Sequence, residues 1–176
     1  GVRPGAETRL DALDFGIPQS IGEFAVTAFP TSHDAPGSCG FRLDAAGGAV
    51  GVLTDTGYVT DEAADILEGV DLAVLEANHD IETLRSGPYP YYLKQRILGA
   101  QGHLSNEDAA RFAAVLAQSG TSEIILAHLS RENNTPAMAQ AAVERPPRRL
   151  YKISPSAFRH TGSSPSAYGP PAHGVG

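Results

Sequence analysis

The chain has 176 residues, enough for one compact domain, and its 41% hydrophobic and 19% charged residues are an ordinary globular mixture. Its formal charge of −7 argues against non-specific attraction to nucleic acid, although it leaves room for a local basic patch beside an acidic site. No apolar stretch approaches the length of a membrane span, and a single cysteine, Cys39, excludes an intrachain disulfide and favours a reducing compartment such as the cytoplasm.

The first half of the chain is typical of short strands followed by one capped helix. Residues 1–20 are polar and rich in turn formers, with no convincing period. Strands are predicted, in chain order, at residues 23–29, 39–44 and 49–54. Thr60 can cap the next helix, whose first turn carries two acidic residues, and Gly69 can end it.

The second half alternates between strands and helices. Apolar runs predict strands at residues 72–75 and 123–127, and helical patterns occur at residues 89–98 and 106–119. Ser105 and Asp108 form a capping-box pattern at the start of the second of these helices. Thr135, followed by proline, opens a last helix. The alternation indicates an α/β layered fold.

Five residues that can bind a metal occupy polar, turn-like or strand-end positions: His33, Asp55, His79, His103 and His128. Asp55 and His128 follow predicted strands, at the sheet edge where ligands bind in open α/β folds. Imidazole and carboxylate groups suit zinc and manganese, and a bound metal can supply hydroxide near neutral pH. Spacing alone leaves the alternatives open: a loop histidine, a turn aspartate bonded to its own backbone, or a strand-end histidine bonded to a carbonyl.

Six sequence blocks carry a more specific signal. They read SHDAPGSCGFRL, VGVLTDTGYV, DLAVLEANHD, GPYPYYLKQRI, GHLSNEDA and LAHLSRENNTP, and they cover roughly residues 22–140. In this order they resemble the YycJ/WalJ-like exonuclease branch of the metallo-β-lactamase-fold hydrolases. Several blocks also look like the tRNA 3′-processing nucleases of the same superfamily. The resemblance implies an αββα sandwich.

The resemblance also implies a role for each matching residue. His33 resembles a ligand of a first metal, His128 a ligand of a second, and Asp55 the carboxylate that bridges the two. The implied cofactors are two divalent ions, zinc or manganese, in the intact protein. His103 resembles a histidine that binds no metal and protonates the leaving oxygen; the alternative is that it only precedes a capped helix.

Five further residues are assigned from the same blocks. His79 and Asp80 are expected to order the loop around the site rather than to bind metal. Lys94, Arg96 and Arg131 are the best candidates for holding the backbone of a DNA end. The alternative for the first two is that they are solvated helix charges.

One motif of the superfamily, HxHxDH, does not occur in this sequence. We therefore expect residues 1–153 to be a partial domain, the C-terminal portion of the αββα sandwich. The Ser-, Pro- and Gly-rich residues 154–176 are expected to be a disordered tail. An incomplete sandwich would expose apolar sheet surface, so the chain should be less soluble than its composition suggests.

The preferred function is metal-dependent phosphodiester hydrolysis, with exonuclease action on DNA ends. One rival is another hydrolase of the superfamily, acting on RNA, on a cyclic phosphodiester or on a carboxylic ester. The second rival is a non-catalytic remnant without a complete metal site. The sequence does not determine the oligomeric state.

Overall fold

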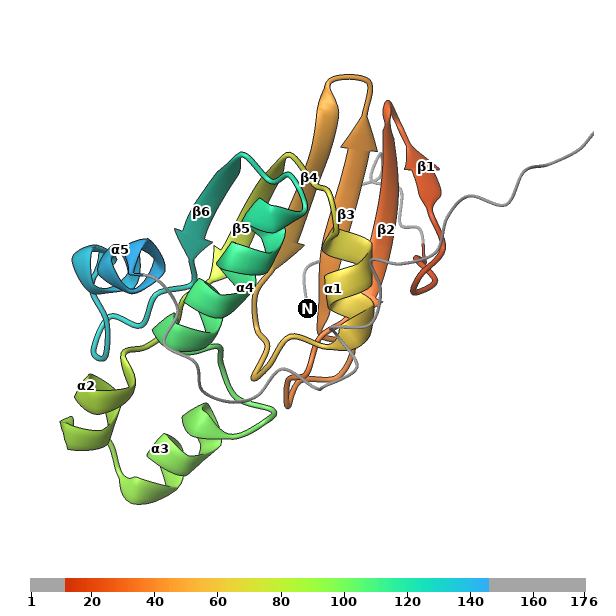
Figure 1. Ribbon diagram of the computed structural model, residues 1–176. Coiled ribbons are helices and arrows are strands. Elements are labelled where there is room, and N and C mark those ends of the chain that lie inside the picture. Colours follow the sequence, from red (N-terminus) through yellow and green to blue (C-terminus); the bar gives the residue numbers. More distant parts are fainter. Residues whose placement is uncertain (1–11, 146–176) are drawn as a thin grey trace, which may run out of the picture.

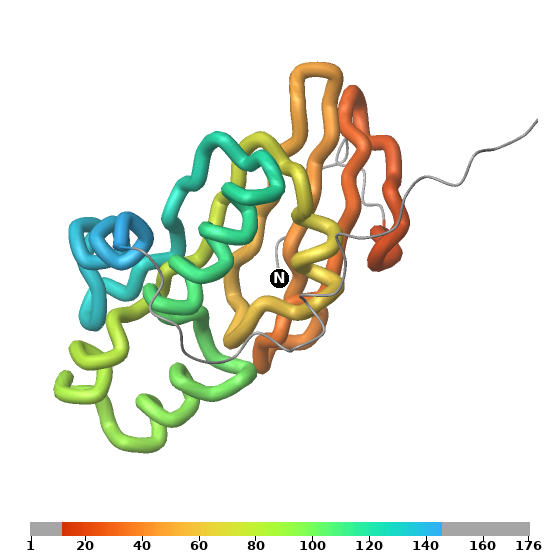
Figure 2. Tube along the Cα trace, in the orientation of Figure 1, coloured from red at the N-terminus to blue at the C-terminus, as the bar shows by residue number. Residues whose placement is uncertain are grey.

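The computed structural model describes residues 12–145, which form one six-stranded sheet. The strands lie in sequence order: β1 (Gln19–Ile21), β2 (Phe24–Pro30), β3 (Cys39–Ala45), β4 (Gly48–Leu53), β5 (Leu72–Glu76) and β6 (Glu123–Ala127). The first four pair antiparallel, whereas β5 and β6 each run parallel to the strand before them. Figure 2 follows this path along the chain. The tail predicted at residues 154–176 lies outside the described residues.

Four strands share one direction. Because β3 is antiparallel to both β2 and β4, and β5 and β6 continue parallel to β4, the strands β2, β4, β5 and β6 all point the same way. Their carboxyl ends therefore meet at one edge of the sheet, at the bottom of Figure 1. This is the edge at which open α/β folds bind ligands.

The helices are α1 (Asp61–Leu67), α2 (Ile81–Ser86), α3 (Tyr91–Leu98), α4 (Asn106–Gln118) and α5 (Pro136–Glu144). Figure 1 shows α1 and α4 over one face of the sheet, with α5 beside α4 and β6. Helices α2 and α3 project beyond the carboxyl edge of the strands. Residues 81–98, which contain both, are called the arm below. None of the helices in residues 12–145 is long and apolar enough to cross a membrane.

Side-chain caps fix three of the helix starts, as the sequence predicts. Thr60 accepts from the backbone N–H of Ala63, and Ser105 accepts from that of Asp108. Thr135 accepts from the N–H three residues later, and proline occupies the next position. Each cap satisfies one otherwise unpaired N–H and contributes about 1 kcal/mol.

The hydrophobic core lies between the sheet and the helices α1 and α4. Its largest fully buried apolar side chains include Phe29, Leu53, Leu67, Leu75 and Leu116. Burying each such side chain stabilises the fold by about 1.5–3 kcal/mol. The sheet face approaches α1 so closely that a Cβ at Gly51 would lie 2.5 Å from a methyl group of Leu67. The core thus holds the carboxyl edge of the sheet rigidly.

Two elements were not predicted from the sequence. Strand β1 falls partly in the segment that shows no period, and it pairs with β2. Helix α2 has six residues in a stretch that was interpreted as a polar loop, and Asp80 caps it by accepting from the N–H of Thr83 at 2.8 Å. Elements this short carry too few residues for a period to show.

Candidate metal centre

Four candidate side chains come from the shared carboxyl edge of the sheet. His33 follows β2, Asp55 follows β4, and His128 directly follows β6. Glu76 is the last residue of β5. His103 reaches the same place from the other side, two residues before the cap of α4. The fold therefore brings together all four residues that the sequence nominated as metal ligands or proton donor, and adds Glu76.

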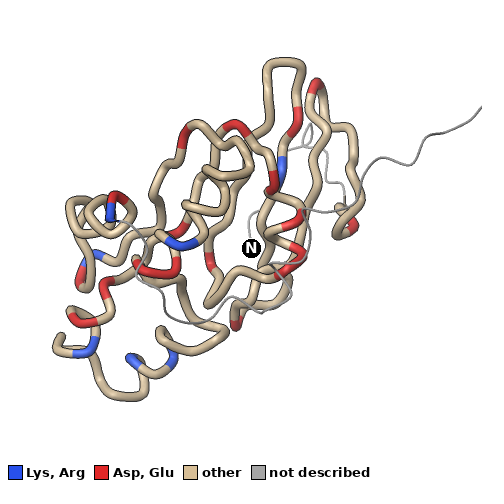
Figure 3. Tube along the Cα trace, in the orientation of Figure 1, with Lys and Arg blue, Asp and Glu red and all other residues tan. Residues whose placement is uncertain are grey.

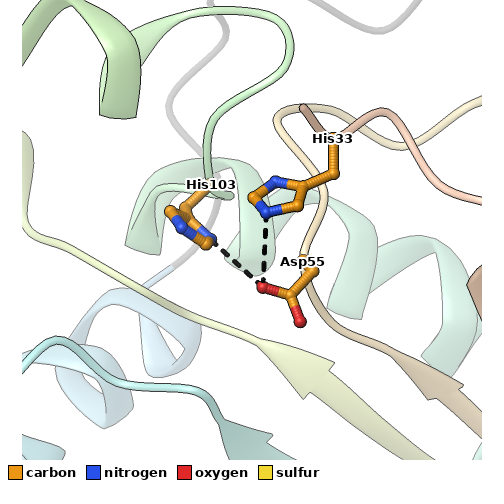
Figure 4. A group of neighbouring side chains, drawn as sticks. All are labelled: His33, Asp55 and His103. Carbon is orange, nitrogen blue, oxygen red and sulfur yellow. Dashed lines mark ion pairs between the residues drawn. The ribbon is translucent and has the colours of Figure 1, made fainter. Parts of the chain in front are cut away.

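Asp55 lies at the centre of the cluster. Its Oδ1 is 3.7 Å from Nε2 of His33, 3.6 Å from Nε2 of His128 and 3.8 Å from Nδ1 of His103. Figure 4 shows His33 and His103 converging on this oxygen. The Asp55 side chain is 42% exposed, so the oxygen is open to a ligand.

Hydrogen bonds fix the ring orientation of both flanking histidines. Nδ1 of His33 lies 2.9 Å from the carbonyl oxygen of Gly102, and Nδ1 of His128 lies 2.7 Å from Oε1 of Glu76. A carbonyl or carboxylate oxygen can only accept, so each Nδ1 carries the proton. Each Nε2 then keeps its lone pair and faces Asp55, the arrangement in which histidine binds a metal.

Glu76 orders two histidines with one oxygen. Its Oε1 accepts from Nδ1 of His103 at 2.8 Å as well as from His128, while Oε2 accepts from the N–H of Thr56 at 2.9 Å. Burial alone would raise the pKa of this fully buried carboxyl, but the hydrogen bonds from His103 and His128 outweigh it and hold the pKa below its ordinary value. Glu76 is therefore an ionised anchor.

The same bond affects His128. Its hydrogen bond to Glu76 raises the pKa of the imidazole, against a smaller opposing effect of burial. The sequence analysis did not single out Glu76. The signal available was a charged residue that ends the apolar run LAVL, in a strand that is otherwise hydrophobic.

The donor set fits a divalent cation. Two ligands that bind one zinc ion at about 2.0–2.2 Å in tetrahedral geometry are separated by roughly 3.3–3.6 Å. The nitrogen–oxygen distances between Asp55 and the two flanking histidines, 3.7 Å and 3.6 Å, are close to this value. Donor atoms of His33, Asp55 and His103 also lie within 4.8 Å of one another.

A second group, Glu76, His103 and His128, also has donor atoms within 4.8 Å of one another. Here Oε1 of Glu76 already accepts two N–H groups and its carboxylate is fully buried. A cation at Glu76 would have to displace those hydrogen bonds. The geometry favours Glu76 as the anchor of the histidines and Asp55 as the ligand.

His79 and Asp80 lie beside the cluster and do not bond to it. His79 is 1% exposed, and neither ring nitrogen has a hydrogen-bond partner within the described residues. Burial lowers the pKa of His79 to about 4, so the ring is neutral. Asp80 caps α2 by accepting from the N–H of Thr83, and its role in ordering the loop around the site stays a prediction.

The three basic residues nominated for substrate contact have different surroundings. Arg96 forms a bidentate ion pair with Asp34, in which Nε donates to Oδ2 at 2.5 Å and Nη2 donates to Oδ1 at 3.1 Å. This pair lowers the pKa of Asp34. The ammonium group of Lys94 donates to the carbonyls of Arg85 and Gly87, inside the arm. Arg131 is exposed and lies outside the set of residues that line the pocket beside the cluster.

That pocket has a volume of about 360 Å³ and opens between the histidines and the arm. Its polar wall includes His33, His103 and His128. The arm supplies the facing wall, which includes Tyr89, Leu93, Arg96 and Ile97. His33 and His128 therefore face a cavity large enough for a small molecule or one unit of a polymer.

Comparison with known proteins identifies the fold family. The family model described as "Beta-lactamase superfamily domain" matches residues 2–129. In structure the chain is similar to the metallo-β-lactamase fold protein YhfI from Bacillus subtilis, with a TM-score of 0.57 and 22% identity over 76% of this chain and 48% of that chain.

Two curated relatives are closer in sequence. The exodeoxyribonuclease WalJ of Streptococcus pneumoniae is 44% identical over 127 residues, which are 72% of this chain and 47% of that protein. The exodeoxyribonuclease YycJ of Bacillus anthracis is 38% identical over 130 residues, 74% of this chain and 49% of that protein. The chain spans about half the length of these relatives.

Divalent metal binding is a property of this fold, and the described residues supply candidate ligands for it. The sequence resemblance to the family is confirmed, and so is the α/β fold that it implied. The chain belongs to the β-lactamase superfamily, in the branch of metallo-β-lactamase-fold proteins that includes WalJ and YycJ.

Proposed function

We propose that the protein is a metal-dependent phosphodiesterase that digests DNA from an end, using two zinc or manganese ions. One observation carries this proposal: Nε2 of His33 and Nε2 of His128 approach the same oxygen of Asp55 from two sides, at 3.7 Å and 3.6 Å. A carboxylate oxygen flanked in this way is suited to bridge two cations. The names of the two curated relatives support DNA as the substrate.

Divalent cations at such a centre would polarise a phosphate and lower the pKa of a water molecule. The residues of the chain prepare the site for this chemistry. Gly102 and Glu76 hold the rings of His33 and His128 so that each Nε2 stays directed at Asp55. This preorganisation means that the ligands need little rearrangement on binding.

His103 is placed to act as the proton donor. Its Nδ1 is bonded to Glu76 at 2.8 Å, and its ring lines the pocket beside Asp55. A protonated ring held there can deliver a proton to the oxygen that leaves when the phosphodiester bond breaks. Glu76 orients the ring through this hydrogen bond.

Arg96 is the best-placed basic residue for contact with the DNA backbone. It lines the pocket, and its side chain is 63% exposed although it is paired with Asp34. Lys94 serves the arm itself through its bonds to two carbonyls. We retain Arg131 as a more distant contact because it is exposed and lies in the same sequence block as His128.

The deciding experiment compares the metal content of three forms of the purified protein by elemental analysis. The wild type is expected to bind zinc or manganese, and Asp55→Asn is expected to lose it because the amide is a poor ligand. Asp65→Asn, an exposed carboxylate on α1, is the matched control and should bind as the wild type does. Equal metal in wild type and Asp55→Asn would refute the proposed centre.

Activity is then measured on end-labelled DNA, RNA of the same sequence and a small carboxylic ester. Metal-dependent release of nucleotides from DNA supports the proposal. Faster turnover of RNA or of the ester by the metal-loaded protein would show that this compound, rather than DNA, is the preferred substrate. A protein that binds no metal and digests nothing would be the non-catalytic remnant.

A further inference from the structure

The arm presents an apolar surface to the candidate metal centre. Leu93 and Ile97 are four residues apart on α3 and therefore share one face, and Tyr89 precedes the helix on the same side of the pocket. All three are partly buried and line the pocket opposite the histidines. One wall of the cavity is thus rich in histidine, and the wall facing it combines an aromatic ring with two branched aliphatic side chains.

The volume limits what can occupy this space. At about 360 Å³ the pocket lies at the lower end of the range for small-ligand sites, about 300–1,000 Å³. One nucleotide has the matching composition, since its phosphate is an anion and its base is a flat apolar ring with polar edges. Aromatic side chains stack on bases of single strands without regard to sequence.

We propose that the pocket holds the terminal nucleotide of a single-stranded end, with its base stacked on Tyr89 and packed against Leu93 and Ile97. The inference rests on the proposed function and adds how the substrate end is recognised. The phosphate next to that base then lies at the wall formed by His33 and His103. Recognition of a base by stacking predicts that ends of any sequence bind.

Charge favours a nucleic-acid strand at this position. Between residues 81 and 98 the chain has three basic side chains, Arg85, Lys94 and Arg96, and one acidic side chain, Glu82, although the whole chain carries −7. Figure 3 shows these basic positions on the arm, apart from the acidic residues of the helices that cover the sheet. A locally basic arm beside the pocket suits a phosphate backbone that continues from the terminal nucleotide.

Two contacts hold in place the wall of the pocket that Tyr89, Leu93 and Ile97 form. Lys94 bridges from α3 to the carbonyls of Arg85 and Gly87, at 2.6 Å and 2.7 Å, and so fixes the turn that carries Tyr89. Arg96 attaches α3 to Asp34, the neighbour of His33. The wall and the candidate ligands are therefore linked by a direct ion pair, and the distance between base and phosphate sites is defined.

The arm also provides a matched control. Tyr92 lies in α3, three residues after Tyr89, is 74% exposed and does not line the pocket. Truncating Tyr92 removes the same kind of side chain from the arm without touching the proposed base site. If truncation of Tyr89 weakens binding and truncation of Tyr92 does not, a general change in the arm cannot be the cause.

The experiment measures binding of an internally labelled single-stranded oligonucleotide by fluorescence anisotropy, with the metal-loaded protein and phosphorothioate terminal linkages to prevent digestion. Tyr89→Ala is expected to weaken binding about 5- to 150-fold, the change that corresponds to the loss of one stacked base. Tyr92→Ala and Tyr89→Phe should bind close to wild type. Circular dichroism melts confirm that each variant is folded.

A second oligonucleotide, with abasic terminal residues, tests the contact itself. It should bind the wild type as weakly as the natural strand binds Tyr89→Ala, and Tyr89→Ala should lose nothing further. Equal losses on both strands would show that Tyr89 does not touch the base and would overturn the proposal. So would a wild type that binds abasic and natural ends equally.

The outcome also separates this inference from the proposed function. If the wild type digests natural and abasic ends at the same rate with zinc or manganese, the nuclease proposal stands and base recognition by Tyr89 is wrong. If it binds and digests neither strand, the proposed function fails, and the assignment of the pocket fails with it.

Discussion

Asp55 and His128 share a left-handed backbone conformation, with φ of 54° and 57°, and among residues 12–145 they are the two residues other than glycine with positive φ. Each directs its side chain toward the other, so that Nε2 of His128 lies 3.6 Å from Oδ1 of Asp55. This conformation costs about 1–2 kcal/mol for an ordinary residue, although aspartate and histidine tolerate it better than most. Strain of this kind is concentrated at functional sites.

The strain at Asp55 predicts different stabilities for two substitutions that both remove the carboxylate. Asp55→Gly should be more stable than Asp55→Ala by about 1 kcal/mol, because glycine adopts positive φ without a clash of Cβ. Urea unfolding in the presence of EDTA measures the difference between the two variants. Equal free energies of unfolding would show that the backbone at Asp55 is not strained.

Replacing Glu76 by glutamine should disturb both histidines that it anchors. The pKa of His128 should fall, since its hydrogen bond to an ionised carboxylate is what raises it. Metal affinity should drop about 10- to 100-fold although Glu76 is not a ligand. Histidine titrations by NMR on the metal-free protein report the first effect. Glu62→Gln, on the exposed side of α1, is the control, and an unchanged titration of His128 in the Glu76 variant would contradict the assignment.

The neutral, buried ring of His79 predicts acid instability. Its pKa is about 4 in the folded protein and 6.5 when exposed, so the unfolded state binds the proton more readily. The contribution to stability is complete above pH 6.5 and is lost as the pH falls toward 4. The difference of about 2.5 in pKa corresponds to about 3 kcal/mol.

His79→Leu should remove this part of the pH dependence. The free energy of unfolding, measured by urea at several pH values between 4 and 7, should fall less steeply for the variant than for the wild type. Parallel curves for the two proteins would show that His79 is protonated as easily in the folded state as in the unfolded state.

The ion pair between Arg96 and Asp34 should matter for the arm more than for the fold. Because the Arg96 side chain is 63% exposed, Arg96→Ala should change global stability by less than about 1 kcal/mol. Amide exchange in residues 88–98 should become faster, since the arm loses its attachment beside His33. Hydrogen exchange with mass spectrometry resolves the two effects. Uniform acceleration across the sheet would instead indicate global destabilisation.

The strands and most helices were predictable because their signals are local. Thr60, Ser105 and Thr135 each cap a helix within one turn. The strands β4, β5 and β6 are each formed by a short apolar run that the sequence itself displays. Strand β1 has only three residues and depends on its pairing with β2. Its stability comes from a neighbour rather than from its own sequence.

The site was predictable in part for the same reason. His33, Asp55, His103 and His128 lie in distinctive blocks, and the fold brings them together. Glu76 acts on histidines 27 and 52 residues away, and a single sequence does not display such a contact. The interaction of Arg96 with Asp34 spans 62 residues and was likewise not visible.

The candidate ligands and the wall that faces them are built on different parts of the molecule. Asp55 and His128 follow the parallel strands β4 and β6, and their anchor Glu76 ends β5 between them; the spacing of neighbouring strands, about 4.8 Å, is set by backbone hydrogen bonds. The facing wall belongs to the arm. Changes between residues 81 and 98 can therefore alter which molecule reaches the centre without moving its ligands. Relatives that diverge in substrate choice should differ most in that segment, while the sheet edge keeps a common geometry.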